Sequence, residues 1–220
     1  MTTSDQRGRM MLITETAVLD AYRADPEPIP DHRGLFYEAL RHESLLAATG
    51  QPLEVRQVHF TVSRRNVLRG IHGTTLPPGQ GKIVTCVRGA ALTVVVDLRV
   101  GSPTFGAHDV VRQDARSGTA LCLADGLGLA YLTLSDDTCM NYLCTREYVP
   151  GTIIDIDALD PALGLPWELP EPPVRSARDA AAPTLDAAAD RGLLPAYEDC
   201  LRAYRSFPDT STPEAATKNR

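Results

Sequence analysis

Residues 82–98 read KIVTCVRGAALTVVVDL, which is two runs rich in Val, Ile, Leu and Thr on either side of Arg88-Gly89. β-Branched and apolar residues favour strands, and a Gly in the link favours a tight turn between them. We therefore expect strands over Lys82–Arg88 and Ala90–Leu98. These two expected strands predict an all-β fold built from antiparallel strands.

Short segments of the same composition surround this pair from about Leu53 to Thr145. Gly, Pro, Asp and Ser interrupt them at intervals typical of antiparallel sheets. The loop PPGQG is expected at residues 77–81. The pattern predicts a sandwich or barrel with six further strands, at Leu53–Val62, Val67–His72, Phe105–Arg112, Thr119–Leu123, Leu127–Leu134 and Thr138–Thr145.

The segments that flank this core have different patterns. Asp31–Leu46 is expected to begin extended and to continue as a helix, serving as a lid or an interface segment. The Pro-rich run Pro161–Pro173 contains Trp167, the only tryptophan, and is expected to be an extended strap on the barrel. Leu185–Phe207 has the apolar spacing of an amphipathic helix, which Pro195 must interrupt.

Length and composition bound the number of domains. The chain has 220 residues with 43% hydrophobic content, enough for one globular domain with appendages. We expect a single domain over residues 1–207, with the barrel core at about 50–150 and a strap and helices at 151–207. The polar end, residues 208–220, is expected to be a disordered tail.

Charge and hydropathy exclude two classes of partner. The formal net charge is −6 and no Lys/Arg run is present, so the electrostatic pattern of a nucleic-acid binder is missing. No apolar run approaches the roughly 18 residues of a membrane span, and the polar N-terminus lacks the apolar core of a secretion signal. We expect a cytoplasmic protein with neither a nucleic-acid nor a membrane partner.

The cysteines and histidines do not form a recognisable metal or disulfide pattern. The cysteines are odd in number and contain no CxxC pair, which favours buried free thiols; they are Cys86, Cys122, Cys139, Cys144 and Cys200. The histidines show neither HxH nor HExxH spacing; they are His32, His42, His59, His72 and His108. No metal is expected.

Four residues form a set suited to moving a proton beside a ketone. Abstraction of such a proton needs a base that titrates near neutrality, such as His72, and a carboxylate such as Asp179 to orient it. Tyr142 could return the proton from the opposite face, and Lys82 could stabilise the enolate oxygen. Each has an ordinary alternative: a strand histidine, a helix capping box beginning at Ser176, a core aromatic and a solubilising lysine.

Three arginines offer the planar fork that suits phosphate oxygens: Arg33, Arg69 and Arg178. Gly70, next to Arg69, would let a ligand approach the backbone closely. Arg64-Arg65 is expected to be a solvated turn.

Taken in order, many motifs match one family at compatible spacing: Asp31–Glu38, Gln57, Arg69–His72, Gly81–Val84, Val96–Arg99, Ser102–Gly106, Tyr142, Tyr148, Leu165–Trp167, Ser176–Pro183 and Gly192–Tyr197. The chain resembles the dTDP-4-dehydrorhamnose 3,5-epimerases and related dTDP-4-keto-6-deoxyhexose epimerases. The resemblance implies a cupin-type jelly roll, usually a homodimer, that needs no metal. It also implies epimerisation of a nucleotide-linked 4-keto sugar in deoxysugar biosynthesis, with no cofactor beyond the substrate's own carbonyl.

The resemblance also assigns roles to residues. It implies that His72 is the base, Asp179 its partner, Tyr142 the acid and Lys82 the contact to the enolate. The expected substrate-binding residues, some of them reaching across the dimer interface, are Arg33, Phe36, Glu38, Gln57, His59, Arg69, Leu129, Tyr148 and Arg178.

The chain departs from the family pattern at several pocket positions. In Gly126–Tyr131, Leu129 replaces a histidine that lines the active site. His59 stands where asparagine is usual, Ile153 where some members have a ligand-contacting glutamate, and Arg178 where lysine is common. These changes leave the base, acid and enolate positions intact.

Leu129 leaves three functions open. With a more apolar sugar pocket, the chain is an epimerase at C5, C3 or both, on a more deoxygenated sugar; this is the interpretation we favour. A second hypothesis applies the same acid-base pair to another carbonyl or cyclisation substrate. A third is a non-catalytic ligand-binding cupin, for which the retained proton-transfer set has no evident use.

Overall fold

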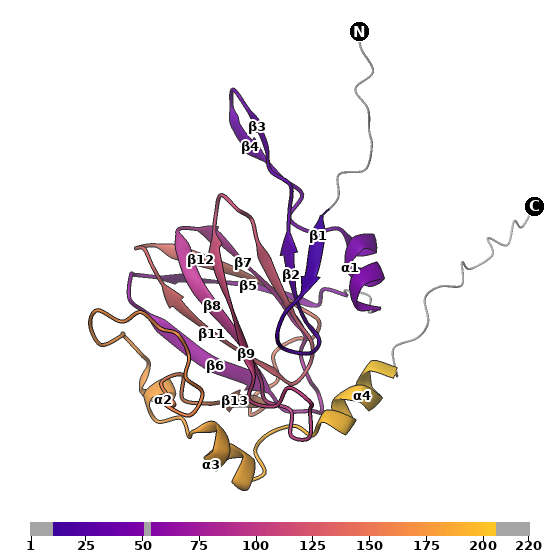
Figure 1. The fold of residues 1–220 in the computed structure, drawn as a ribbon, viewed down its shortest axis with the longest axis vertical. Helices are drawn as coiled ribbons and strands as arrows, with labels where there is room; N and C mark the ends of the chain where they lie inside the picture. The colour runs from indigo at the N-terminus through magenta and orange to yellow at the C-terminus, as the bar shows by residue number, and fades with distance from the viewer. Residues whose placement is uncertain (1–10, 51–53, 206–220) are drawn as a thin grey trace, which may run out of the picture.

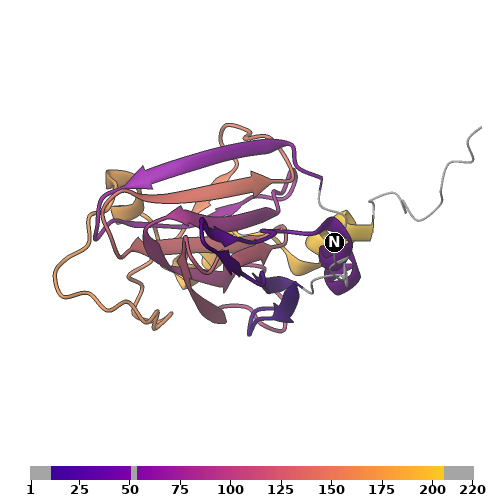
Figure 2. The same cartoon turned by 90° about the horizontal axis from the view of Figure 1, so that it is seen from above.

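Two antiparallel sheets face each other in the computed structural model of the chain, which describes residues 11–50 and 54–205 (Figures 1 and 2). They form the jelly roll that the sequence predicts. The six-stranded sheet has the order β1 (Leu12–Glu15), β2 (Ala21–Asp25), β10 (Ala120–Leu123), β7 (Lys82–Arg88), β12 (Thr138–Cys144) and β5 (Gln57–Ser63). The five-stranded sheet has the order β13 (Ile153–Asp155), β6 (Leu68–Thr74), β11 (Leu127–Thr133), β8 (Ala90–Asp97) and β9 (His108–Asp114).

The five-stranded sheet is buried on both faces, which explains the unbroken valine run of β8. Val95 points into the space between the sheets, while Val94 and Val96 pack on the opposite side against the C-terminal strap. Trp167 of the strap packs on the same cluster, and its indole N–H donates to the Ala158 carbonyl at 2.8 Å. Trp167 thus joins the segment expected as a strap to this face, and apolar burial on two faces anchors the sheet.

Within the described ranges, four short helices accompany the sheets: α1 (His42–Thr49), α2 (Ala177–Ala180), α3 (Leu185–Asp190) and α4 (Tyr197–Arg205). Residues 191–196 lie outside helices, so the expected single C-terminal helix with a break near Pro195 is wrong in extent. Arg191 ends α3, Gly192 has a φ of 65°, and the Pro195 carbonyl accepts a hydrogen bond from Val100 N–H. None of the described helices is long and apolar enough to span a membrane. The predicted tail, 208–220, lies outside the described residues.

All eight expected strands are present, with corrected ends. β5 begins at Gln57 rather than Leu53, and β9 runs from His108 to Asp114 rather than from Phe105 to Arg112. The shift of β9 has a local cause, since the N–H groups of Phe105 and Ala107 bond within the turn that begins at Ser102. The sequence pattern did not indicate β1, β2 and β13. β1 and β13 are edge strands, and β2 joins β1 to β10.

A buried ion pair holds the loop after β8. Arg99 is fully buried and donates to Asp97 at 2.8 and 2.9 Å, while Ser102 and Thr104 donate to the same carboxylate. Burial opposes the charge, but these hydrogen bonds hold the pKa of Asp97 below its ordinary value. The motifs around Asp97 and Ser102 are therefore structural.

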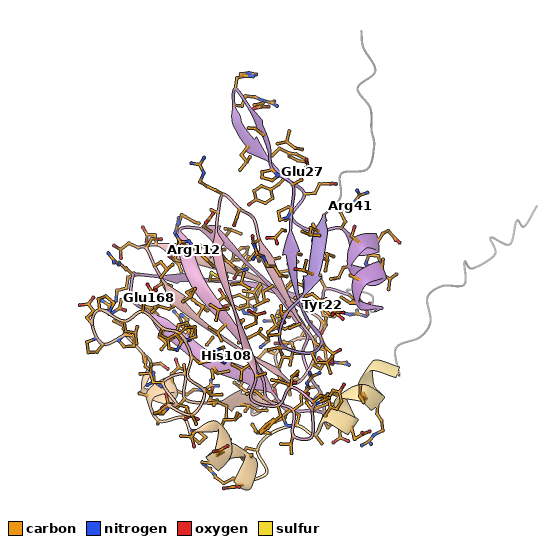
Figure 3. All side chains as sticks on the ribbon, in the orientation of Figure 1. Tyr22, Glu27, Arg41, His108, Arg112 and Glu168 are labelled. Carbon is orange, nitrogen blue, oxygen red and sulfur yellow. The ribbon has the colours of Figure 1, made fainter. Side chains whose placement is uncertain are left out.

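A two-stranded hairpin, β3 (Ile29–Asp31) and β4 (Gly34–Phe36), projects away from the sandwich (Figure 1). Its side chains stand clear of the rest of the chain in Figure 3, where Glu27 is labelled at its base. The hairpin followed by α1 confirms the expected change from extended chain to helix in Asp31–Leu46. An isolated hairpin of this size is marginally stable in water, which suggests that another surface supports it.

Candidate active site

A cavity of about 360 Å³ opens between the two sheets, within the range of small-molecule sites. Residues of both sheets and of the segments that follow them line it: Gln57, His59, Thr61, Arg69, His72, Gln80, Lys82, Leu129, Tyr131, Tyr142, Tyr148, Ile153 and Arg178. The cavity therefore gathers all the catalytic candidates except Asp179, which contacts His72 from outside the lining.

Strand β5 supplies polar side chains to the cavity from alternate positions. Gln57, His59 and Thr61 face inward, while Val58, Phe60 and Val62 are each more than half exposed on the outer face. This division follows from the two-residue period of a strand. Thr61 was not predicted as a site residue, although the same alternation extends to it from Gln57 and His59.

A β-bulge in β6 brings Arg69 and His72 to the same cavity. These residues are three positions apart and would face opposite sides of a regular strand. In the structure they pair with Tyr131 and Leu129, which are only two positions apart, so β6 carries an extra residue at this point. Gly70 occupies the bulge with a φ of 102°, and a Cβ there would lie 2.4 Å from the Leu129 carbonyl oxygen. Only glycine fits this position.

His72 and Asp179 form a direct pair. The His72 Nε2 lies 2.7 Å from the Asp179 Oδ1, although the residues are 107 positions apart. Ser176 caps α2 by accepting from the Asp179 N–H at 3.0 Å, and Arg175 donates to the Asp179 carbonyl oxygen. Asp179 thus belongs to the helix cap through its backbone N–H and to the pair with His72 through its carboxylate, so both interpretations of this motif are correct. With Nε2 donating to the carboxylate, Nδ1 carries the lone pair of a base.

The carboxylate of this pair is charged at neutral pH. Burial of Asp179 opposes ionisation, but the hydrogen bond and charge of His72, followed by Ser176 and Arg175, hold the pKa of Asp179 below its usual value. The Asp179 side chain is 5% exposed, whereas that of His72 is 35% exposed. A shielded carboxylate behind an accessible imidazole is the arrangement of an oriented general base.

Tyr142 and Lys82 lie on neighbouring strands of the opposite sheet. Burial and the neighbouring Tyr131 raise the pKa of Tyr142 well above its ordinary value, so the phenol keeps its proton. Burial lowers the pKa of Lys82, and the nearby Cys144 and Asp125 oppose that shift. The cavity therefore has a proton acceptor on one sheet and a proton donor with an ammonium group on the other.

Asp155 is a site residue that the sequence did not reveal. Its carboxylate accepts two hydrogen bonds from Arg178, at 2.6 and 2.7 Å, and lies 3.6 Å from the His72 Nε2. It comes from β13, whose three residues are too few to show a strand pattern. Gln80 and Tyr131 were also missed as site residues; Tyr131 bonds to Thr61 at 2.7 Å and lies beside Tyr142.

Three predicted binding residues lie away from the cavity of their own chain. Arg33 and Phe36 are on the projecting hairpin, where the Arg33 side chain is 79% exposed and pairs with Asp31. Glu38 follows the hairpin and lies 4.0 Å from Arg41. The other predicted binding residues line the cavity: Gln57, His59, Arg69, Leu129, Tyr148 and Arg178.

His72, Asp155 and Asp179 place one potential metal-ligand atom each within 4.8 Å of one another, among the residues the structure describes. These atoms already have partners. The His72 Nε2 is bonded to Asp179, and Asp155 is bonded twice to Arg178. A cation would have to displace both arrangements, so the donor set does not fit a resident metal.

Comparison with known proteins gives consistent matches. The family described as dTDP-4-dehydrorhamnose 3,5-epimerase matches residues 15–187. A dTDP-4-dehydro-6-deoxyglucose 3-epimerase of Streptomyces bikiniensis is 48% identical over 81% of this chain and 91% of its own length.

Solved structures match the fold at similar coverage. NovW, a 4-keto-6-deoxy sugar epimerase from the novobiocin gene cluster of Streptomyces spheroides, has a TM-score of 0.84 and 41% identity over 88% of this chain and 97% of that one. A double mutant of ChmJ, a 3'-monoepimerase from Streptomyces bikiniensis in complex with dTDP, has a TM-score of 0.83 and 43% identity over 87% of this chain and 96% of that one. In that mutant a histidine is replaced by asparagine and a tyrosine by phenylalanine.

Proposed function

We infer the function from one premise, that the chain belongs to the dTDP-4-dehydrorhamnose 3,5-epimerase family. It is an enzyme of the isomerase class, and it epimerises a dTDP-4-keto-deoxyhexose of the kind made for secondary metabolites. The roles of its residues, the carbon that it inverts and its assembly are our proposals.

His72 removes a proton from the carbon beside the substrate's C4 ketone, and Tyr142 returns a proton from the other face. Lys82 stabilises the oxygen of the enolate formed between these steps. The observation that carries this assignment is the arrangement of one cavity, with the His72–Asp179 pair on one sheet and Tyr142 and Lys82 on the other. Inversion needs such an acid and base on opposite faces of one carbon.

A comparison of spacing supports the same pair. The histidine and tyrosine replaced in the ChmJ double mutant are separated by the same number of positions as His72 and Tyr142. The relative has the same fold, so the simplest explanation is that its replaced histidine and tyrosine are the equivalents of His72 and Tyr142.

The inverted carbon is C3. Two relatives named as 3-epimerases are 48% and 47% identical to this chain and a third is 40% identical, against 41% to 44% for relatives named as 3,5-epimerases. Leu129, which is 6% exposed at the cavity wall, offers no hydrogen bond there. An apolar group at this position is compatible with a deoxygenated part of the sugar.

Charged and amide groups at the cavity hold the nucleotide and diphosphate. Arg69 and Arg178 supply guanidinium groups, which bind phosphate oxygens in pairs. Gln57 accepts from the Tyr148 N–H at 2.6 Å, which ties the loop after β12 to β5 at the cavity. Arg178 exchanges its bonds to Asp155 for the substrate when the diphosphate enters.

The active assembly is a homodimer in which the hairpin of each chain completes the other's cavity. The hairpin carries Arg33 and Phe36 away from its own sandwich, and it has no cluster of its own to pack on. The edge strand β5 presents Val58, Phe60 and Val62 outward, an apolar stripe that a monomer would expose to water. A second copy of the chain covers this stripe.

Solvent exchange tests the reaction. In deuterium oxide, dTDP-4-keto-6-deoxyglucose should gain deuterium at C3 and not at C5, with formation of the C3 epimer followed by NMR. His72→Ala should lower the exchange rate by roughly 10²- to 10⁴-fold, the usual contribution of a general base. His108→Ala, which changes a β9 histidine outside the cavity (labelled in Figure 3), should retain the wild-type rate.

Three outcomes would contradict these assignments. Deuterium at C5 would overturn the choice of carbon, and undiminished exchange in His72→Ala would overturn the choice of base. Tight binding of dTDP without any exchange would instead indicate a ligand-binding protein.

A further inference from the structure

The imidazole of His59 lies flat against the ring of Tyr142. Their ring centroids are 4.5 Å apart and the planes differ by 11°. The two residues are directly opposite each other on the paired strands β5 and β12, and both line the cavity. None of the roles proposed above uses this contact.

We propose that His59 is a positioning residue that sets the plane of the Tyr142 ring and so decides on which face the enolate is reprotonated. The inference rests on the proposed function, because it assigns a consequence to the role of Tyr142 as the acid. His59 acts through Tyr142 and does not itself transfer the proton.

The plane of the ring matters because a phenol O–H lies close to the plane of its ring. In that orientation a lone pair of the oxygen, perpendicular to the plane, conjugates with the π-system. Rotation of a tyrosine ring about its Cβ–Cγ bond is only weakly restricted by the side chain itself, so packing must hold the plane. A stacked neighbour with 11° between the planes holds it. The direction of the Tyr142 proton is thus set by its neighbour.

The surroundings of His59 favour a neutral ring. Burial first, and then the charge of Lys82, lower the pKa of His59. The titratable groups that face it are Lys82 on β7 and Tyr142 and Cys144 on β12. The Cys144 Sγ lies 3.9 Å from Nδ1, and burial raises the pKa of that thiol. A neutral imidazole can stack on the phenol without adding a second cation beside Lys82.

Two fates of the enolate follow from the proposed chemistry. If Tyr142 gives its proton, the enolate electron pair forms the new C–H bond on the opposite face and the C4 carbonyl is restored. The His72 imidazolium then releases its proton to water, and the tyrosinate recovers a proton from water. If the His72 imidazolium exchanges its proton with the solvent and returns it before Tyr142 acts, the original configuration is restored with solvent hydrogen at the carbon. In deuterium oxide the first fate gives deuterated product and the second gives deuterated starting sugar.

The test is the ratio of exchange with retention to exchange with inversion, measured by NMR on the full-length enzyme. His59→Asn and His59→Gln remove the stacked ring, and the ratio should rise by roughly two- to ten-fold, the factor that loss of one aromatic stack supports. His59→Phe keeps a flat ring without nitrogens, and its ratio should stay close to that of the wild type.

Gln57→Ala is the matched control, since Gln57 also points inward from β5 and does not stack on Tyr142. It should slow turnover without moving the ratio. The proposal is overturned if His59→Asn and His59→Gln keep the wild-type ratio while folded, or if His59→Phe changes it as much as they do. Absence of exchange in the unmodified enzyme would instead overturn the proposed reaction, and this inference with it.

Discussion

At the scale of single residues, the roles in this cavity are set by neighbours rather than by residue type. His72 resembles any strand histidine until Asp179 is seen at 2.7 Å from its Nε2. Tyr142 resembles a core aromatic, yet burial raises its pKa so far that it keeps the proton an acid must deliver. Asp155, which no sequence pattern marked, holds Arg178 at the same site.

Asp179→Asn tests the pair at this scale. The amide presents either an N–H or a neutral oxygen to His72, so it no longer stabilises the imidazolium that forms when the base takes a proton. We expect kcat to fall by roughly 10²- to 10⁴-fold with little change in KM, because Asp179 contacts His72 and does not line the cavity. Steady-state kinetics at pH 7 measures both parameters.

Asp157→Asn is the control for that change. Asp157 accepts a hydrogen bond from Arg175, and Arg175 also donates to the backbone carbonyl of Asp179. The control therefore alters the surroundings of Asp179 and leaves the His72–Asp179 pair in place. A loss in Asp157→Asn as large as that in Asp179→Asn would show that the effect is structural.

At the scale of elements, the bulge in β6 brings two predicted site residues of one strand to the same cavity. A regular strand would turn either Arg69 or His72 away from the cavity, since the two are three positions apart. The pairing of β6 with β11 absorbs the extra residue at Gly70. The motif around Arg69 was visible in the sequence, but its geometry was not, because a bulge depends on the partner strand.

Gly70→Ala tests the bulge. The new methyl group would meet the Leu129 carbonyl oxygen at 2.4 Å, so β6 or β11 must shift. We expect a loss of about 2 kcal/mol or more in the free energy of unfolding. Activity should be lost as well, because the bulge orients both Arg69 and His72. Urea denaturation and the exchange assay measure the two effects.

Gly101→Ala is the control for Gly70→Ala, because it introduces backbone strain without a steric clash. Gly101 has a φ of 86° with nothing within 4 Å of the added Cβ, so we expect a cost of about 1 kcal/mol and unchanged kinetics. If Gly70→Ala behaved like this control, the close approach to β11 would have no functional importance.

At the scale of the whole molecule, two features of the chain lie apart from its cavity. Arg33 and Phe36 extend from the sandwich on a hairpin, and β5 leaves an apolar edge uncovered. The proposed homodimer accounts for both features, because an isologous interface lets each hairpin reach the other cavity.

Complementation between inactive variants tests this arrangement. Co-expressed Arg33→Ala and His72→Ala chains pair at random, and half of the dimers then contain one site with His72 from one chain and Arg33 from the other. We expect recovery of about a quarter of wild-type activity, because each mixed dimer has one intact site of two. The exchange assay on the purified mixture measures the recovery.

His72→Ala co-expressed with Asp179→Ala is the control pair. Both changes affect the same cavity of a chain, so every site in the mixture lacks one of them and no activity should return. Absence of recovery in the Arg33 and His72 mixture would place the action of Arg33 within its own chain and contradict the exchanged hairpin.

The sequence by itself determined the sheet-forming core. Runs such as Lys82–Arg88 and Ala90–Asp97 appear as strands because strand preference is a property of neighbouring residues. Tertiary structure alone decided which side chains meet. His72 and Asp179 are 107 positions apart, Asp155 joins them from a three-residue strand, and the His59 ring stacks on Tyr142 across a strand pair. Contacts of this kind depend on register, on a bulge and on the packing of two sheets, which no local stretch of sequence encodes.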